Sequence, residues 1–365
     1  MNILTASLSV LLMLLFIIPR TASAAYHFTN FKGTPPIHSL GTWTQFPIGM
    51  TPDQIKRIYH LPSSGGHGTI AIIGAYNDAT IESDLAAFDK QFNLPACTKA
   101  SGCFAQHLMS TKEGTNSGWD LETSLDVEWA HAIAPNAKIL LVEATTQSGA
   151  NLLKAVDYAA SQKDVIAVSM SWGGEEFPEE TSLDSHFKSG SGAVFFASSG
   201  DKGSGVSWPA ASPEVIGVGG THVAISASGD QQNETAWSGS GGGISAYEKE
   251  PPYQSGFTIP RAGGMRAIPD VSYDADPSSG FPIYYKGKWR EVGGTSAGAP
   301  QWAAIAALGH GSNLQQLYAD KAAPNAANYF RDIVSGTNGA CGYLCTARKH
   351  YDYVTGLGSP LTDTF

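Results

Sequence analysis

Short, almost wholly apolar runs alternate along this chain with segments that are expected to form helices. The apolar runs are typical of strands buried on both faces of a sheet, and they lie at 69–74, 138–143, 164–171, 193–197 and 214–218. The expected helices lie at 81–92, 151–161 and 183–188. This alternation predicts an α/β fold with a mostly parallel central sheet and helices on both faces.

The N-terminal part does not follow this alternation. Residues 4–18 are apolar and small residues follow at 22–25, which is typical of a secretory signal peptide. A membrane anchor is the alternative, but the run is shorter than the roughly 20 residues that span a bilayer. We therefore expect a signal peptide at 1–24, a short extension at 25–50 without a long prodomain, and one domain at 51–365. The mature chain is expected to be extracellular and free of the membrane.

Composition argues against a nucleic-acid partner. The chain has 22 Lys and Arg against 32 Asp and Glu, a net charge of −10, and only 15% charged residues. Its 41 Gly, 20 Pro and 42% hydrophobic residues indicate a loop-rich globular protein. An excess of carboxylates at low charge density suits a protein that works in acid, where carboxylates protonate and repel each other less. We expect a monomer.

The four cysteines form two close pairs, Cys97 with Cys103 and Cys341 with Cys345. In an exported chain an even number of cysteines indicates disulfides, so we expect the two local pairings. Metal binding is the alternative, but the pairs lack a CxxC spacing and a nearby pair of histidines.

Ser296 is the first candidate for chemistry, in the motif GTSAGAP at 294–300. It lies between a short extended segment and an apolar helix expected at 301–308. A serine at such a junction is exposed, and its N–H lies at a helix N-terminus where negative charge is favoured, which suits an acyl-transfer nucleophile. An ordinary helix cap explains the same residue equally well.

A serine nucleophile needs a base, and a pair of carboxylates supplies one candidate. Glu122 and Asp126 lie four residues apart at the start of a helix expected to end near Pro135, so their side chains share one face. Such a pair can share a proton, with one carboxyl acting as a base and the other orienting it. A solvated acidic face is the alternative.

Histidine is the more familiar base, but both nearby candidates lie in poor contexts. His67 lies in a Ser/Gly-rich loop directly before the first core strand, and no aspartate-bearing strand of the kind a subtilase needs is visible upstream. His131 lies in an Ala-rich helix, where a packed or surface histidine is more common.

A third carboxylate, Asp201, follows the apolar strand that begins at Ala193, in the sequence SSGDKG at 198–203. Ligand sites of parallel α/β sheets lie beyond the carboxyl ends of the strands. An aspartic acid at this place donates a hydrogen bond to an oxyanion only while it is protonated.

Together these motifs resemble the sedolisin family of serine-carboxyl peptidases, which have a subtilisin-like fold. The resemblance covers nearly all of the chain after residue 50, and four motifs follow the family's order: ETSLDVEW at 122–129, SMSWGG at 169–174, SGD at 199–201 and GTSAGAP at 294–300.

The resemblance implies a secreted, acid-acting serine endopeptidase that cleaves proteins and peptides through an acyl-enzyme. Ser296 would be the nucleophile, Glu122 the base and later the acid, and Asp126 the group that orients Glu122. Protonated Asp201 and the N–H of Ser296 would hold the oxyanion, which implies an acidic optimum. Lys202 follows Asp201 and is expected to favour its ionised form.

The segment SMSWGG is expected to line the cleft and to pair its backbone with an extended substrate. This expectation involves Ser171, Trp172, Gly173 and Gly174.

The resemblance also implies one calcium ion near the C-terminus. Its expected ligands are the carboxylates of Asp332 and Asp352 and the carbonyl oxygens of Ile333, Arg348 and His350. The family usually has glycine at the last two carbonyl positions. A plain turn that contains aspartate is the alternative.

Two other functions stay open at this point. One is a secreted homologue that binds peptides without cleaving them, against which the intact set of candidate catalytic residues argues. The other is a subtilase-like hydrolase that uses His67 as its base.

Overall fold

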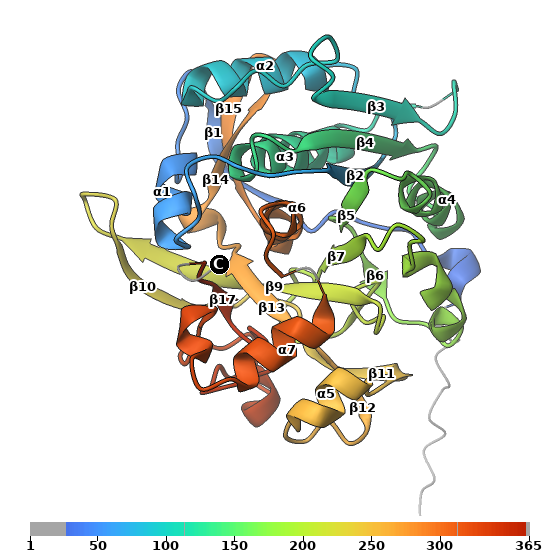
Figure 1. Cartoon of the computed structure of the whole chain (residues 1–365), viewed down its shortest axis with the longest axis vertical. Helices are drawn as coiled ribbons and strands as arrows, with labels where there is room; N and C mark the ends of the chain where they lie inside the picture. Colours follow the sequence, from blue (N-terminus) through green and yellow to red (C-terminus); the bar gives the residue numbers. More distant parts are fainter. Residues whose placement is uncertain (1–26, 113, 312, 363–365) are drawn as a thin grey trace, which may run out of the picture.

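An eight-stranded, mostly parallel sheet forms the centre of the structure (Figure 1). The computed structural model describes residues 27–112, 114–311 and 313–362, so the expected signal peptide lies outside the described residues. The strand order is β10-β9-β7-β5-β2-β4-β3, with β13 paired to β9, and only β10 runs antiparallel to its neighbour. The strands are β2 (Thr69–Ala75), β3 (Phe104–Leu108), β4 (Lys138–Ala144), β5 (Val165–Met170), β7 (Val194–Ser198), β9 (Val215–Ile225), β10 (Gln231–Ala236) and β13 (Val271–Asp274).

Helices cover both faces of this sheet, which confirms the predicted fold class (Figure 1). In β2, Ile70 and Ile72 belong to the core shared with α3 (Ser117–Ile133) and α6 (Thr295–Ala307). Ala71 and Ile73 belong to the core beneath α4 (Gly149–Ala160). Successive residues of a strand point to opposite faces, so a continuous apolar run is what a sheet covered on both sides requires.

The remaining helices lie around this framework. They are α1 (Pro52–Ile58), α2 (Ile81–Phe92), α5 (Pro252–Phe257) and α7 (Leu314–Ala322), with short 3-10 helices η1 (Phe28–Asn30), η2 (Glu180–Phe187), η3 (Pro277–Ser279), η4 (Ala326–Asn328) and η5 (Gly342–Cys345). The helix expected at 183–188 is therefore the 3-10 helix η2 rather than an α-helix. α1 begins after Thr51, which forms a capping box with Gln54.

Residues 27–50, expected as an extension, pack into the domain. β1 (His38–Thr44) pairs antiparallel with β15 (Lys288–Gly293), which also pairs with β14 (Phe281–Tyr285). Phe31 and Met50 are each only 1% exposed. The apolar pattern gave no strand here because β1 is an exposed edge strand of mixed composition. Three further pairs are β6 (Gly174–Glu175) with β8 (Ser207–Trp208), β11 (Gly243–Lys249) with β12 (Met265–Ile268), and β16 (Phe330–Arg331) with β17 (Ser359–Pro360).

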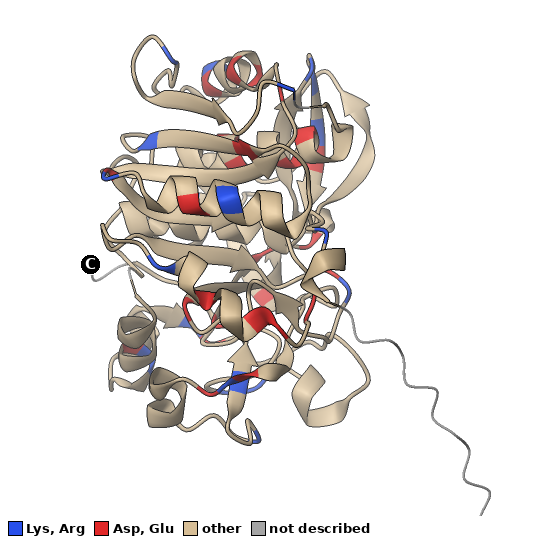
Figure 2. Ribbon diagram, turned by 90° about the vertical axis from the view of Figure 1, so that its right-hand side faces the viewer, with Lys and Arg blue, Asp and Glu red and all other residues tan. Residues whose placement is uncertain are grey.

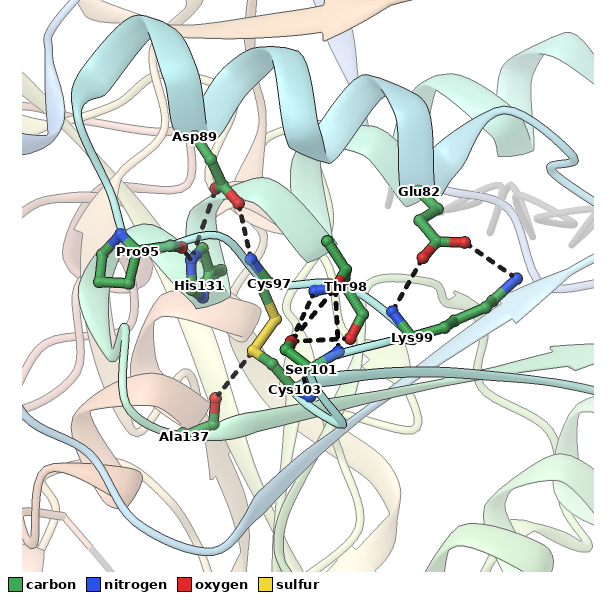
Figure 3. Close-up of a disulfide and its surroundings, with 10 residues drawn as sticks. All are labelled: Glu82, Asp89, Pro95, Cys97, Thr98, Lys99, Ser101, Cys103, His131 and Ala137. Atoms are coloured by element: carbon green, nitrogen blue, oxygen red, sulfur yellow. Dashed lines mark hydrogen bonds and ion pairs between the residues drawn. A yellow bond between two sulfur atoms is a disulfide. The ribbon is translucent and has the colours of Figure 1, made fainter.

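Both expected disulfides are formed, Cys97–Cys103 and Cys341–Cys345. The first lies beneath α2 and beside His131 (Figure 3). Because its two sulfurs are bonded to each other, this group of two cysteines and a histidine does not offer thiolate ligands to a metal. The His131 Nε2 lies 2.8 Å from the carbonyl oxygen of Pro95, as a packed histidine would.

Charged residues of both signs are dispersed over the described part of the chain (Figure 2). Within that part, no helix combines the length and the apolar character needed to cross a bilayer.

Candidate active site

Helix α3 places Glu122 and Asp126 side by side inside the protein. Asn116 caps the helix by accepting hydrogen bonds from two backbone N–H groups of its first turn. The two carboxyl residues are 2% and 1% exposed, so they are not a solvated acidic face. Burial raises the pKa of both carboxyls, and the charge of Asp126 raises the pKa of Glu122 further. The pair therefore retains a proton well above the pH at which ordinary carboxylic acids ionise.

The Ser171 hydroxyl links this pair to the helix of the candidate nucleophile. Its Oγ lies 2.7 Å from Asp126 Oδ1 and 3.1 Å from the carbonyl oxygen of Ser296. A hydroxyl has one proton, so it donates to one of these acceptors at a time. Its bond to Asp126 opposes the effect of burial on the pKa of that carboxyl. Ser171 thus points inward and not, as expected, toward the substrate.

Ser296 lies in the first turn of α6. The backbone just before this turn requires a glycine at position 294. Gly294 has a φ of 132°, and a Cβ there would lie 2.0 Å from the carbonyl oxygen of Pro36 and 2.6 Å from Asp201 Oδ2. The Ser296 Oγ donates to the same Pro36 oxygen at 2.9 Å. The hydroxyl also lies near enough to Glu122 to lower the pKa of that carboxyl in part.

Asp201 reaches this point from the loop after β7. Its Oδ1 accepts hydrogen bonds from the N–H and the Oγ of Thr295, both at 2.8 Å, and its Oδ2 lies 3.1 Å from His38 Nε2. Burial raises the pKa of Asp201, while His38 and Thr295 oppose the rise. Lys202 is exposed, so the cation that acts on Asp201 is His38 instead.

Residues 34–38, here called the cleft segment, cover the candidate nucleophile. Thr34 pairs antiparallel with Gly173 through two backbone hydrogen bonds of 3.0 and 3.2 Å. In Figure 1 this blue segment crosses the middle of the molecule between η1 and β1. Ser296 is consequently 0% exposed, whereas the sequence suggested an exposed serine. The two prolines of the segment indicate extended backbone, but no pattern in the sequence says where it binds.

A cavity of about 360 Å³ lies beside the cleft segment. Its walls are residues 173–175 and the loop 198–207 that carries Asp201. Gly173 and Gly174, two of the residues expected to line the substrate cleft, are thus in the wall of this cavity. Trp172 is not: it is 0% exposed and lies behind the cleft, where a Cβ on Gly33 would be 3.2 Å from its ring.

The geometry excludes His67 as the base for Ser296. Its backbone N–H donates to the carbonyl oxygen of Ala307, at the C-terminal end of α6. Ser296 lies at the other end of that helix, about 16 Å away at a rise of 1.5 Å per residue. Proton transfer needs hydrogen-bond reach, which His67 does not have.

The residues expected to hold calcium lie together in the C-terminal loops. The Asp332 carboxylate accepts hydrogen bonds from the His350 N–H at 3.0 Å and from Lys321 Nζ at 2.7 Å. The Asp352 carboxylate accepts hydrogen bonds from the Arg348 N–H at 3.1 Å and from two backbone N–H groups that follow Asp352 in the chain. His350 has a φ of 73°, which explains why glycine suits this position.

Carboxylate oxygens suit a hard cation, and the hydrogen bonds from residues 348 and 350 bring the loops of these two carboxylates together. Lys321 already brings one positive charge to Asp332, so an ion bound there would share this carboxylate with the lysine ammonium.

Comparison with known proteins places these residues in a family. The model of the subtilase family matches residues 59–327. Sedolisin from Pseudomonas sp. (strain 101) is 28% identical over 85% of this chain, and kumamolisin from Bacillus sp. (strain MN-32) is 31% identical over 86%. The chain spans only 60% and 62% of the lengths of these two relatives.

Comparison with solved structures points to the same relatives as the sequence comparison. Pseudomonas sedolisin, a serine-carboxyl proteinase, superposes with a TM-score of 0.75 and 28% identity, covering 88% of this chain and 96% of that one. Another relative with 28% identity is tripeptidyl-peptidase 1 from Dictyostelium discoideum, of which the chain covers 57%. The expected fold and family are thereby confirmed: this chain belongs to the subtilase family, in its sedolisin branch.

Proposed function

We propose that this protein is a secreted, acid-acting serine endopeptidase that uses Ser296 as its nucleophile. One observation carries the proposal: the Ser296 Oγ lies 2.9 Å from the carbonyl oxygen of a peptide bond, that of Pro36. Two buried carboxyls and Asp201 lie around the same hydroxyl. A hydroxyl, a proton acceptor and an oxyanion donor around one carbonyl group are the parts that acyl transfer needs.

In the proposed reaction, the Ser296 Oγ attacks the carbonyl carbon while its proton passes to Glu122. Asp126 holds the proton that the pair shares, so that Glu122 is free to act as the base. The oxyanion lies between protonated Asp201 and the N–H of Ser296. The C–N bond then breaks as Glu122 returns the proton to the leaving amine. Water, deprotonated by Glu122, hydrolyses the acyl-enzyme, and Ser296 regains its proton.

Cleavage within chains, rather than removal of N-terminal tripeptides, is supported by the path of residues 31–44. The backbone continues on both sides of the Pro36 carbonyl, from the buried Phe31 to the β1 pairing with β15. Because the chain continues on the amino side of Thr34 through Gly33 to Phe31, the cleft accommodates a backbone that has no free amino group three residues before the carbonyl.

Acid action is supported by the role proposed for Asp201. The carboxyl donates to the oxyanion only when protonated, and burial raises its pKa. Ionised Asp201 would place a negative charge beside the developing oxyanion. Secretion is supported by the apolar run at 4–18 and by two formed disulfides, which persist in oxidising compartments.

Calcium binding at Asp332 and Asp352 is also part of the proposal, as a structural rather than a catalytic feature. The ion would tie the loop at 332–333 to that at 348–352 through carboxylate and carbonyl oxygens.

The direct test is cleavage of a denatured protein at about pH 3–5 by the full chain and by Ser296→Ala. We expect internal cleavage by the wild type and none by the variant, with His67→Ala as the matched control that keeps full activity. If the folded wild type cleaves nothing, the chain is a peptide-binding homologue. Products that are all tripeptides would contradict the endopeptidase assignment.

A further inference from the structure

We propose that a cavity at the amino ends of β7 and β9 binds an organic cation, a guanidinium or ammonium group carried on an apolar stem, and that Glu248 is its main partner. The cavity has a volume of about 690 Å³ and lies where η2, β11, α5 and α7 meet these two strands. No residue of the four sequence motifs lines it. The inference does not rest on the proposed peptidase function.

This cavity is separate from the candidate active site. Val194 and Phe195, at the start of β7, line it, whereas Asp201 follows the other end of the same strand. The five residues of β7 span about 16 Å at a rise of about 3.3 Å per residue. Figure 1 shows α5, α7 and β11 grouped below the central sheet. A small ligand bound here would therefore not touch the groups around Ser296.

Carboxyl groups outnumber amines around the cavity. Four carboxyl residues and two lysines line it: Asp184, Glu214, Glu248, Glu250, Lys188 and Lys249. Lys188 forms an ion pair of 3.0 Å with Glu214. Lys249 is exposed, and its Nζ lies 3.5 Å from the sulfur of Met265. The remaining carboxyls give the cavity a negative character that attracts a cation.

Glu248 is the residue that points to a ligand. It is only 3% exposed, and its Oε1 has no hydrogen-bond partner among the described residues. The cation that acts on this carboxyl is Arg266, but both terminal nitrogens of that guanidinium donate to Asp270, at 2.8 and 2.6 Å. A buried carboxylate oxygen without a donor is costly. A positively charged donor in the cavity would supply the missing contact.

The spacing of the carboxyls favours an organic cation over a metal ion. Among the described residues, the carboxyls of this cavity do not form a group close enough to ligate one ion. A guanidinium or ammonium group needs only one or two carboxylates, and its apolar stem can pack along an apolar wall. Phe187, Leu314 and the ring of Tyr253 supply such a wall. An aromatic ring also attracts a cation directly.

Binding is expected to strengthen as the pH rises. Burial, together with the charges of Asp184 and Glu176, raises the pKa of Glu248 to about 8, against the effect of Arg266. A bound cation favours the ionised carboxylate, so its binding lowers this pKa and releases a proton. As the pH falls below 8, the free site takes up that proton and the affinity for the cation declines. Acid therefore empties the site.

The other buried carboxyls near Glu248 do not take its place. Burial raises the pKa of Glu180 to about 9, so this group stays protonated over the same pH range, and its Oε2 accepts a backbone N–H at 2.9 Å. The Glu176 carboxylate accepts hydrogen bonds from residues 245 and 246 of β11. Asp184 Oδ1 accepts a serine hydroxyl at 2.7 Å. Each of these carboxyls has a donor within the protein, which leaves Glu248 Oε1 for the ligand.

Calorimetric titration of the full chain tests the site without relying on catalysis. Ser296→Ala serves as the background, which prevents self-digestion. The probes are a capped tripeptide with a central arginine, the same peptide with citrulline as its neutral isostere, and spermidine as a free polyamine. Glu248→Gln removes the charge at nearly constant shape. Glu175→Gln is the matched control, because Glu175 is an exposed glutamate in the wall of the other cavity, beside the cleft segment.

We expect the arginine peptide to bind the background at about pH 7.5 with release of a proton, and the citrulline peptide not to bind. Glu248→Gln should weaken binding about tenfold or more, the loss of one charge-assisted hydrogen bond, and should remove most of the proton release. Lowering the pH to about 5.5 should weaken binding to the background about tenfold or more and change little in Glu248→Gln. Glu175→Gln should match the background.

The two cationic probes separate the sources of such a group. Tighter binding of the peptide identifies a side chain of a polypeptide as the ligand, and tighter binding of spermidine identifies a free polyamine. Binding of neither probe to the folded background would overturn the proposal. So would a loss of binding in Glu175→Gln alone, because the cation would then occupy the active-site cleft. If Glu248→Gln lowers the melting temperature but binds as the background does, the carboxyl only supports Arg266, and the proposal is wrong.

Discussion

Two pairs of carboxyl groups in this protein are surrounded very differently. Glu122 and Asp126 lie in the core, and the described groups that act on Glu122 are Asp126, Ser296 and Asp201, none of them a cation. Asp332 and Asp352 lie in the C-terminal loops, where backbone N–H groups and Lys321 surround them. Burial still raises the pKa of Asp352, but only to about 6, because four hydrogen bonds oppose it. A buried pair with only hydroxyl donors holds a proton, whereas carboxylates that accept several backbone N–H groups and a lysine hold loops together.

Removing the titratable group at position 122 is expected to have the largest effect, and it tests whether the buried pair of carboxyls takes part in catalysis. Glu122→Gln keeps the shape of the side chain but cannot accept the Ser296 proton. We expect peptide cleavage to fall by about 10²–10⁴-fold, the usual contribution of a general base. The control is a thermal melt: because a buried acid that resists ionisation disfavours folding at high pH, the variant should be no less stable than the wild type at neutral pH. Retained activity would mean that another group takes the proton.

Asp201 gives the next largest effect and tests the oxyanion assignment. Asp201→Ala removes a donor and is expected to lower turnover by about 10²–10³-fold at acid pH. Asp201→Asn retains a donor at every pH, so its loss should be smaller and its activity should no longer decline as the pH rises through the pKa of Asp201. A pH–rate profile of Asp201→Asn that matches the wild type would show that this carboxyl does not set the upper pH limit.

The sequence was sufficient to predict the central strands and the pair of carboxyls on α3, but it did not predict the path of the cleft segment. Strands such as β2 are predictable because burial on both faces requires a continuous apolar run. The carboxyl pair is predictable because its spacing of four places it on one helical face. The position of the cleft segment was not predictable, because an exposed edge strand and two prolines carry no information about the distant residues that they contact. Likewise, only the folded chain reveals that Ser171 contacts Asp126 and that the cation beside Asp201 is His38.

The buried carboxyls outside the active site extend the comparison to overall stability. Burial raises the pKa of Asp78 to about 6, of Asp89 to about 7 and of Glu248 to about 8. Each folded-state pKa lies above the unfolded value near 4, so the folded state binds more protons between those values. Stability is therefore full below about pH 4 and declines as the pH rises through 6 to 8.

We expect the melting temperature of Ser296→Ala to fall by about 5 °C or more between pH 4 and pH 8. Using the inactive variant prevents self-digestion during the scan. Asp89→Asn should flatten the decline, because Asn does not titrate. A melting temperature that rises over this range would contradict the assignment of these carboxyls as protonated groups.

The smallest effect concerns the C-terminal pair and its cation. If calcium binds at Asp332 and Asp352, excess calcium should raise the melting temperature by about 2–4 °C and a chelator should reverse the gain. Asp332→Asn should abolish the response, with magnesium as the ionic control because it requires a tighter octahedral site. Lys321→Met should increase calcium affinity, since the ammonium 2.7 Å from Asp332 Oδ1 competes for the same carboxylate. If neither wild type nor Lys321→Met responds to calcium, the hydrogen bonds and the Lys321 ion pair hold these loops together without a metal ion.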